Sequence, residues 1–247
     1  MKNCISRFCL LALLLALPCW AQSVAEPRPS VVVRYFEFPP FSFTNRQGQP
    51  DGSVLRLTRR LLEEAGYAGD IRALPSARVY AGLADGSVQL WPGAPGVPQL
   101  QDKVLEAGVT LGEVTLNLYY REGEPRPNLP GDLRGKRLIL LNGYTYRPPV
   151  SDWLRDPRLR LQLTHTRTHQ AALAMLERRR GDYLIDYDSP IDRELRESGD
   201  APPPAIPLLK LPVKLIYSRH NPQAEQLRDD LDRAYQTLRE AGVDLDI

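Results

Sequence analysis

The feature of this sequence that most restricts its fold is a regular alternation of short β-rich runs with amphipathic helical segments. From residue 31 the order is strand, helix, strand, helix, strand, and the alternation starts again near residue 136. Neighbouring parallel strands need a crossover connection, which a helix usually provides, so each series predicts a mainly parallel sheet flanked by helices. The expected strands are 31–36, 70–74, 87–91, 136–142, 159–164, 182–187 and 213–218, and the expected helices are 53–67, 76–86, 148–156, 168–181, 189–199 and 223–242.

Several helix ends carry their own sequence signals. Ser53 is the expected N-cap of the first helix, and Gly66 is its expected stop. Ser189 is the expected N-cap of a later helix, with Pro190 at the first helical position and Gly199 just past the end. These signals fix the expected boundaries of the two helices.

Two strands are expected to connect the two series. A stretch rich in Pro and Gly, 92–98, interrupts the alternation, and the following strand 114–122 is long enough to run between two bodies. The strand 213–218 returns after an expected loop at 200–207. The prediction is therefore two α/β lobes with two crossings and a cleft between them, where loops at the carboxyl ends of the strands converge. One lobe would comprise residues 26–118 and 218–247, and the other residues 119–217.

The N-terminal residues have the pattern of a secretory signal peptide, assigned to 1–21. Lys2 and Arg7 precede a short apolar run at 10–18, and small residues follow. All three Cys lie in this segment, so the mature chain, starting near Gln22 or Glu26, is predicted to be exported to the periplasm without any thiol. A lipid anchor at Cys19 is the less favoured alternative, because Pro18 stands where a small residue is usual.

Charge and composition argue against several functions. Without Lys2 and Arg7, 30 basic residues remain against 30 acidic ones, so nucleic acid is not an expected partner. His165 and His169 have a spacing that can bind zinc on one helix face, but Thr168 as the expected cap would leave His165 outside the helix. With no G-x-S-x-G motif and no Cys in the mature chain, we expect no catalytic residues, no metal and no cofactor.

Three segments resemble those of bacterial extracellular solute-binding proteins of the polar-amino-acid class. They are "PPFSF" (39–43) with "RQGQPDGSVLRLTRRLLEEAG" (46–66), "DLRGKRLILLNGYTY" (132–146) and "ALAMLERRRGDYLIDYDSP" (172–190). The resemblance extends over about residues 30–241. It implies a two-lobed periplasmic-binding-protein fold of type II. It also implies a monomer that closes over a small polar ligand and presents it to a transporter permease or a sensor protein.

The first lobe supplies candidate ligand contacts near an unusual aromatic cluster. Four of the five Phe in the chain fall at 36, 38, 41 and 43. The resemblance assigns Phe38 to stacking on the ligand, and Glu37 could accept hydrogen bonds from it. Phe41 and Phe43 are expected in the lobe core, and Phe36 in either place. Trp91 is a second aromatic wall or a core residue, and Gly93 beside it is a further candidate contact.

The second lobe supplies the remaining candidates. Tyr144 and Thr145 precede a helix expected to open on Pro, where free backbone N–H groups can bind an anion. The resemblance assigns Asp186 to the amino group of the ligand, and Asp188 is either an alternative or a helix cap. Arg78, in the first turn of its helix, is a candidate replacement for the carboxylate-binding Arg that this class carries after the third strand.

The same segments also depart from the class. Residues 91–103 contain no Arg, and "GSVLR" (52–56) replaces the usual acidic pair. Binding of a standard amino acid through the usual carboxylate contact is therefore not expected. Two alternative functions stay open: a protein-docking or signalling module whose cleft no longer binds a small molecule, and a dehydratase-like enzyme on the same fold.

Overall fold

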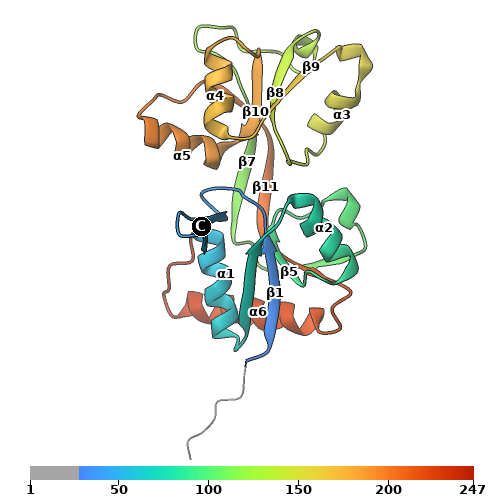
Figure 1. Cartoon of the computed structure of the whole chain (residues 1–247), viewed down its shortest axis with the longest axis vertical. Helices are drawn as coiled ribbons and strands as arrows, with labels where there is room; N and C mark the ends of the chain where they lie inside the picture. The colour runs from blue at the N-terminus through green and yellow to red at the C-terminus, as the bar shows by residue number, and fades with distance from the viewer. Residues whose placement is uncertain (1–27) are drawn as a thin grey trace, which may run out of the picture.

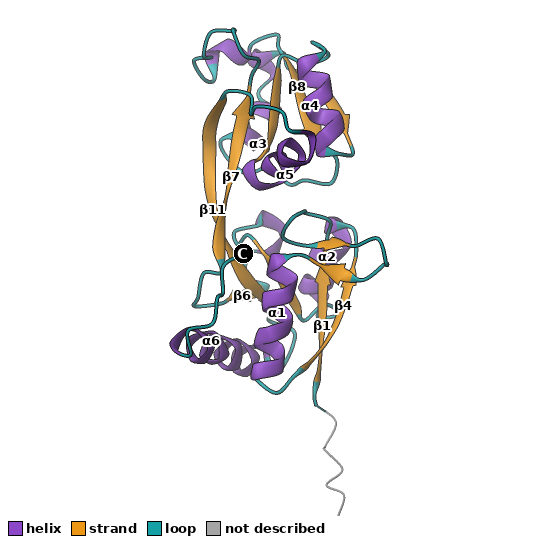
Figure 2. Cartoon of the chain, turned by 90° about the vertical axis from the view of Figure 1, so that its left-hand side faces the viewer, coloured by secondary structure: helices purple, strands orange, loops and turns teal. Residues whose placement is uncertain are grey.

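A computed structural model describes residues 28–247, and the signal peptide assigned to 1–21 lies outside these residues. The described chain forms two lobes stacked along its long axis and joined by two long strands (Figure 1). These strands are β7 (Gly112–Tyr119) and β11 (Ala205–Ser218), which pair with each other in antiparallel orientation. Figure 2 shows the same two strands side by side between the lobes. The predicted α/β fold with two crossings is confirmed.

The first lobe is built around three parallel strands. They are β1 (Ser30–Tyr35), β4 (Ala68–Ala73) and β5 (Leu90–Gly93), with β1 in the middle. Three helices surround them: α1 (Ser53–Glu64), α2 (Ser76–Asp85) and α6 (Ala224–Glu240). A short hairpin of β2 (Phe43–Thr44) and β3 (Pro50–Asp51) precedes α1, and β6 (Val104–Glu106) adds to β11. The sequence did not predict β6.

The second lobe repeats this plan. Its parallel strands are β8 (Arg137–Leu141), β9 (Gln162–Thr166) and β10 (Tyr183–Tyr187), with β8 in the middle. Its helices are α3 (Val150–Arg155), α4 (His169–Glu177) and α5 (Asp188–Ser198). Because β11 and β7 pair between β5 and β10, all the strands except the β2–β3 hairpin belong to one continuous sheet. Its order is β4-β1-β5-β11-β7-β10-β8-β9, and β6 pairs with β11 outside this path. The predicted lobe boundaries at 118/119 and 217/218 lie near the carboxyl ends of β7 and β11, but the cores divide earlier in both strands. Leu116 of β7 already packs in the core of the second lobe, and Leu211 of β11 already packs in that of the first.

Both faces of the sheet are covered by helices in each lobe, which explains the nearly continuous apolar strands. Successive strand residues point to opposite faces. In β5, Leu90 packs with residues of α1 and α6, whereas Trp91 packs with residues of α2. In β10, Leu184 packs with α4 and α5, whereas Ile185 packs with Val150 of α3. A strand that is buried on both faces therefore leaves no polar alternation in the sequence.

Ser53 is not the N-cap of α1. The helix begins at Ser53 itself, after Gly52, and no side chain caps it. The turn after β1 runs so close to Gly52 that a Cβ there would lie 2.3 Å from the carbonyl oxygen of Phe41. The backbone N–H of Val54 donates to that same carbonyl, so the turn takes the place of a side-chain cap.

Other boundaries also differ from those expected. The helix α5 begins at Asp188 rather than after Ser189, because the Asp188 carboxylate accepts the backbone N–H of Ser189 within the first turn. The helix α4 ends at Glu177, and Arg179 then adopts a φ of 57°, which stops the helix before Gly181. The strand β11 begins within the stretch expected to be a loop, because residues 205–207 pair with β7.

Within residues 28–247, no helix combines the length and the apolar composition that crossing a bilayer requires.

Candidate functional site

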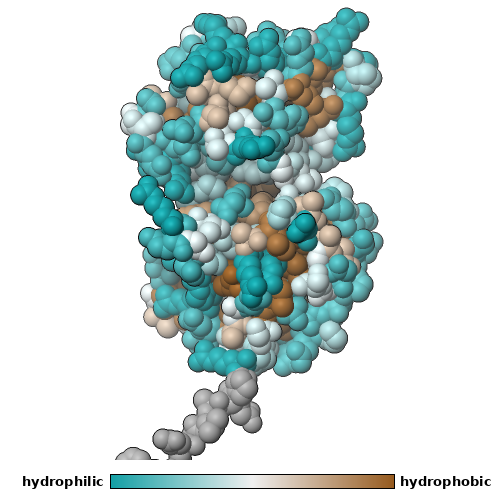
Figure 3. Space-filling view, in the orientation of Figure 1, coloured by the Kyte–Doolittle hydropathy of each residue, from teal (hydrophilic) through white to brown (hydrophobic). Residues whose placement is uncertain are grey.

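A cavity of about 70 Å³ lies between the two lobes and receives residues from both. Figure 3 shows apolar, brown surface in the narrow zone where the lobes face each other. Most of the lining side chains are aromatic or aliphatic. The lining residues are Phe36, Phe38, Phe41, Ser42, Val54, Tyr80, Trp91, Pro92, Gly93, Ala94, Val97, Val114, Gly143, Tyr144, Thr145, Arg147, Tyr187 and Val213.

Trp91 forms one wall of the cavity at the end of β5. Its side chain is 3% exposed, and its ring centroid lies 5.6 Å from that of Phe36 and 5.3 Å from that of Tyr80. Gly93 follows in the same strand, and a Cβ at this position would lie 2.0 Å from the indole ring. Only a glycine therefore lets the indole lie across the backbone here. Trp91 serves both predicted purposes, because it packs in the core and lines the cavity.

Phe38 reaches from the first lobe to the second. Its ring stacks on Phe41 at 5.8 Å between centroids, and it contacts Tyr144 at 5.8 Å and Tyr187 at 5.2 Å across the cleft. Phe41 is buried in the core of the first lobe, as predicted. Phe43 is not in that core, because it lies at the lobe surface with the Arg193 guanidinium of α5 placed 5.0 Å from its ring centroid.

The second lobe contributes Tyr144 and Thr145 to the cavity, together with the positively charged side chain of Arg147. Two hydrogen bonds cross between the lobes beside these residues. The Ser76 hydroxyl donates to the carbonyl of Gly143 at 2.8 Å, and Arg147 Nη2 donates to the carbonyl of Ala94 at 2.8 Å. The helix α3 that follows has six residues and starts only at Val150, too late for its N-terminus to hold an anion at Thr145.

Asp186 does not line the cavity. Its side chain is fully buried, with Oδ2 2.7 Å from His169 Nδ1 and Oδ1 accepting the backbone N–H of Tyr187 at 2.8 Å. The other ring nitrogen of His169 lies 3.3 Å from the Tyr144 hydroxyl. Burial raises the pKa of Asp186, and the contact with His169 opposes that rise. Asp186 is thus connected to the cavity wall only through His169 and Tyr144.

Glu37, Arg78 and Asp188 also lie away from the cavity. Glu37 is exposed, and its carboxylate accepts the hydroxyl of Thr44 at 2.7 Å and the backbone N–H of the same residue. Arg78 is exposed on α2. Asp188 accepts the backbone N–H of Thr115 in β7 at 3.1 Å, which ties α5 to a crossing strand. The structure therefore brings together Phe38, Trp91, Gly93, Tyr144 and Thr145, but not these three charged residues.

Sequence reasoning missed several lining residues, among them the polar side chains of Tyr80, Arg147 and Tyr187. Tyr80 is four residues after Ser76 and so lies on the same side of α2. Tyr187 follows Asp186 and thus points to the opposite face of β10. Arg147 directly follows "GYTY", but nothing in the sequence tells it apart from a solvated arginine.

Arg147 is the one charged side chain among the lining residues. Desolvation lowers its pKa, and the neighbouring Tyr187 and Tyr80, together with the exposed carboxylate of Glu106, oppose this shift. Burial raises the pKa of Tyr187 to about 12 and raises that of Tyr144 well above its usual value. The phenols are therefore neutral at physiological pH, and the cavity carries a net positive charge.

No group of three or more His, Cys, Asp or Glu within residues 28–247 is arranged to hold a metal ion. His165 lies in β9, ahead of the Thr168 side chain that caps α4 by accepting the backbone N–H of Ala171. His169 is engaged with Asp186.

No protein-family model matches the sequence, and neither does any curated protein. Solved structures do match over most of the chain. A histidine kinase sensor domain with similarity to periplasmic binding proteins is 19% identical, with a TM-score of 0.67, and the match covers 87% of this chain and 92% of that one. A substrate-binding protein of an ABC uptake transporter from Streptococcus pneumoniae with bound histidine is 16% identical, with a TM-score of 0.69 and coverage of 86% and 88%.

A third match is an ancestral amino acid-binding protein described as a precursor of cyclohexadienyl dehydratase. It is 13% identical, with a TM-score of 0.67, and the match covers 86% of this chain and 90% of that one. Several other matched structures are named as binding proteins, including an ancestral arginine-binding protein and the substrate-binding protein of an amino acid ABC transporter. At these identities the similarity shows the fold, which is the two-lobed periplasmic-binding-protein fold of type II that the sequence predicted.

Proposed function

We propose that this chain is an exported solute-binding protein of the polar-amino-acid class, whose two lobes close over a small ligand. One observation carries the proposal: a single cavity is walled by side chains of both lobes, and the Ser76–Gly143 and Arg147–Ala94 hydrogen bonds join the lobes beside it. A ligand in this cavity would contact both lobes only when they are closed. That difference in affinity shifts the equilibrium between open and closed forms.

The two crossing strands would serve as the hinge. Between the lobes the backbone connections are β7 and β11, which pair over most of their length. Asp188 fixes α5 to Thr115 in β7, so movement of the second lobe is transmitted to a crossing strand. Rotation of whole lobes about a few residues is the usual way for two domains to close around a ligand.

The closed form would be recognised by a membrane partner, either a transporter permease or a sensor protein. The similarity to transporter-associated binding proteins supports the first partner, and the similarity to a histidine kinase sensor domain supports the second. The signal peptide predicted at 1–21 would place the mature monomer in the periplasm, where such partners expose their receptor surfaces.

Ligand binding can be tested with the mature chain after unfolding and refolding to remove carried-over ligand. A thermal-shift screen against amino acids, polyamines, sugars and small organic acids should give a specific rise in melting temperature, because a ligand of the native state stabilises it by mass action. Trp91 provides a second signal. In a Trp153→Phe variant Trp91 is the sole tryptophan of the mature chain, so a binding compound should change its fluorescence.

Two results would contradict this function. One is the absence of any shift across the panel. The other is a shift that leaves the Trp91 fluorescence unchanged, because it would place the ligand outside the cavity between the lobes.

A further inference from the structure

The cavity combines an aromatic wall with one unpaired cation, and this combination defines a ligand class. We propose that the site binds a small organic monoanion with an apolar body, such as a one-ring carboxylate, and that it rejects ligands carrying an ammonium group. Arg147 would bind the carboxylate, and Phe36, Phe38 and Trp91 would contact the body. This inference rests on the proposed binding function and names the ligand of the same site.

Arg147 has hydrogen-bonding capacity to spare. Within residues 28–247 it forms no ion pair, and its one hydrogen bond runs from Nη2 to the carbonyl of Ala94. A guanidinium has several N–H donors arranged to receive a carboxylate with two parallel hydrogen bonds. The side chain has also lost water on burial, which lowers its pKa. The guanidinium is half-buried, and the exposed carboxylate of Glu106 acts on it from a distance without forming an ion pair. An anionic ligand would supply a counter-ion in direct contact.

Backbone N–H groups near Arg147 are also available to donate hydrogen bonds to a ligand. Among the described residues, the N–H groups of Tyr144 and Thr145 donate to no acceptor, although both residues line the cavity. Gly143 is held at a φ of 82° by the turn, and its carbonyl accepts the Ser76 hydroxyl of the first lobe. The turn thus leaves N–H donors available close to the cation.

An ammonium group would find no carboxylate in this cavity, because no acidic side chain lines it. The three candidates from the sequence are each engaged elsewhere: Asp186 with His169, Glu37 with Thr44, and Asp188 with Thr115. An aromatic cage can attract a cation by itself. Here, however, a ligand cation would share the cavity with the positive charge of Arg147, which repels it.

The size of the cavity limits the apolar body. The cavity volume is about 70 Å³. Because one water needs roughly 10–15 Å³ of such space, about five to seven waters could fill the site. A carboxylate with one ring or one short branched chain would replace that number of waters. The flat faces of Phe36, Phe38 and Trp91 favour a ring, since aromatic pairs gain energy beyond the area that they bury.

Four probes with one aromatic ring differ in the charged groups that they carry: benzoate, benzyl alcohol, benzylamine and L-phenylalanine. Isothermal titration calorimetry on the refolded mature chain should give the tightest binding for benzoate. We expect benzoate to bind about tenfold or more tightly than benzyl alcohol, which has the ring but no charge. Benzylamine and L-phenylalanine should bind more weakly than benzyl alcohol, because each brings an ammonium group toward Arg147.

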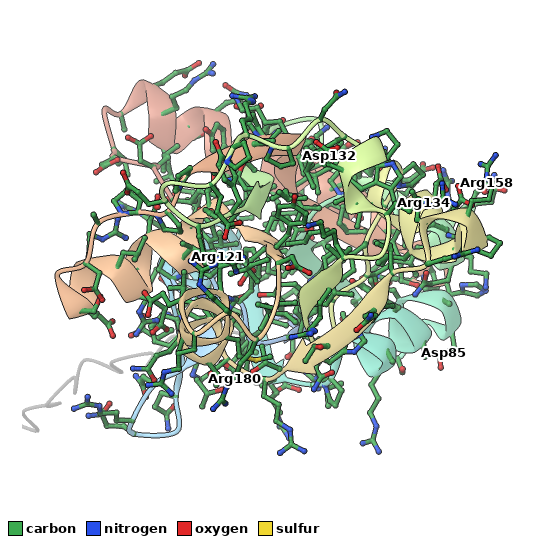
Figure 4. The ribbon with its side chains drawn as sticks, turned by 90° about the horizontal axis from the view of Figure 1, so that it is seen from above. Asp85, Arg121, Asp132, Arg134, Arg158 and Arg180 are labelled. Atoms are coloured by element: carbon green, nitrogen blue, oxygen red, sulfur yellow. The ribbon has the colours of Figure 1, made fainter. Side chains whose placement is uncertain are left out.

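Arg147→Gln tests the assignment of the cation. This variant should lose the preference for benzoate over benzyl alcohol, and Arg147→Lys should keep part of it. The ratio of the two affinities is the readout, because loss of the hydrogen bond to Ala94 would weaken lobe closure over either compound. Arg134→Gln is the matched control, since Arg134 lies on the outer surface of the second lobe (Figure 4) and should leave all four affinities unchanged. A far-ultraviolet circular dichroism spectrum equal to that of the parent protein shows that the Arg147 variants are folded.

The outcomes separate this inference from the proposed function. Tighter binding of benzylamine or L-phenylalanine than of benzoate overturns the ligand class, as does an unchanged preference for benzoate in Arg147→Gln. If carboxylates of this kind fail while another class in the thermal-shift panel binds and changes Trp91 fluorescence, the ligand class is wrong and the binding function stands. If no compound binds at all, both are wrong.

Discussion

His169 Nδ1 lies 2.7 Å from Asp186 Oδ2 in the interior of the second lobe. Both side chains are buried, and Asp186 is fully so. The carboxylate that the resemblance assigns to the ligand is therefore used within the lobe, where it holds His169 beside the Tyr144 hydroxyl. Its first role is to keep the start of α4 fixed against β10 and to support the cavity wall from behind.

Removing His169 should destabilise the protein strongly. In His169→Ala the Asp186 carboxylate loses its hydrogen-bond partner in a fully buried position, and breaking one side of a buried pair costs about 3–5 kcal/mol of unfolding free energy. Urea unfolding at pH 7 measures this loss. His165→Ala is the control, because His165 is exposed in β9 and should change stability by less than about 0.5 kcal/mol.

The same variant should show a defined pH dependence. Burial raises the pKa of Asp186, so the folded protein holds a proton on the Asp186 carboxyl group more tightly than the unfolded chain does. Stability then falls as the pH rises from the unfolded-state pKa through the raised folded-state pKa. Without His169 the pKa of Asp186 rises further, because the contact that opposes the rise is gone. The loss of unfolding free energy in His169→Ala should therefore be smaller near pH 4 than at pH 7. An equal deficit at both values would show that Asp186 is not charged in the native protein.

Gly93→Ala should disturb the Trp91 wall. A Cβ at Gly93 would lie 2.0 Å from the indole, so either the ring or the strand must move. Forcing an extra methyl group into a packed site costs about 1–3 kcal/mol. We expect lower stability in urea and a changed near-ultraviolet circular dichroism signal of Trp91. Gly131→Ala, with open space around the position, should show neither change.

Phe38→Ala should weaken ligand binding more than it lowers stability. Phe38 is partly exposed and touches aromatic rings of both lobes, so it contributes mainly to the closed form. We expect about a tenfold loss of affinity in calorimetry for the compound that stabilises the protein most in the thermal-shift panel. Leu163→Ala, at an exposed position of β9 that does not line the cavity, should leave affinity within about twofold. Equal losses for the two variants would contradict the placement of Phe38 in the site.

Arg78→Gln should leave ligand affinity unchanged. The sequence made Arg78 a candidate because a cation in the first turn of a helix opposes the helix dipole. The structure places it exposed on α2 and puts Arg147 at the cavity instead. Calorimetry with the same compound distinguishes the two arginines. A clear loss of affinity in Arg78→Gln would mean that the ligand extends beyond the cavity toward α2.

The fold was predictable from the sequence because its information is local. Strands buried on both faces give continuous apolar runs, and the helices α1 and α6 carry apolar residues at helical spacing. The exceptions arise from contacts between distant segments. The prolines at 202–204 and 207 suggested a loop, yet β11 already begins at Ala205. It does so because β7, which is distant in the sequence, provides a pairing partner.

The site was predictable only in part, for the same reason. Phe38, Trp91 and Tyr144 were found because large aromatic side chains at a strand end or beside a turn favour a position in a cleft wall over one in open solvent. The resemblance placed Asp186 at the ligand, and nothing in the sequence reveals that His169, 17 residues away, lies against it. Arg147 was overlooked because its importance depends on Ala94 and the aromatic rings of the opposite lobe.

The most direct test of the account is the distance between the lobes with and without ligand. Residues 22–247 contain no Cys, so in that chain Arg60→Cys on α1 and Gln170→Cys on α4, both exposed, allow one spin label on each lobe. Pulsed electron–electron double resonance should show a shift to shorter and more uniform distances when a compound that changes Trp91 fluorescence is added. A distance distribution that does not change while the compound binds would contradict closure of the lobes over a ligand.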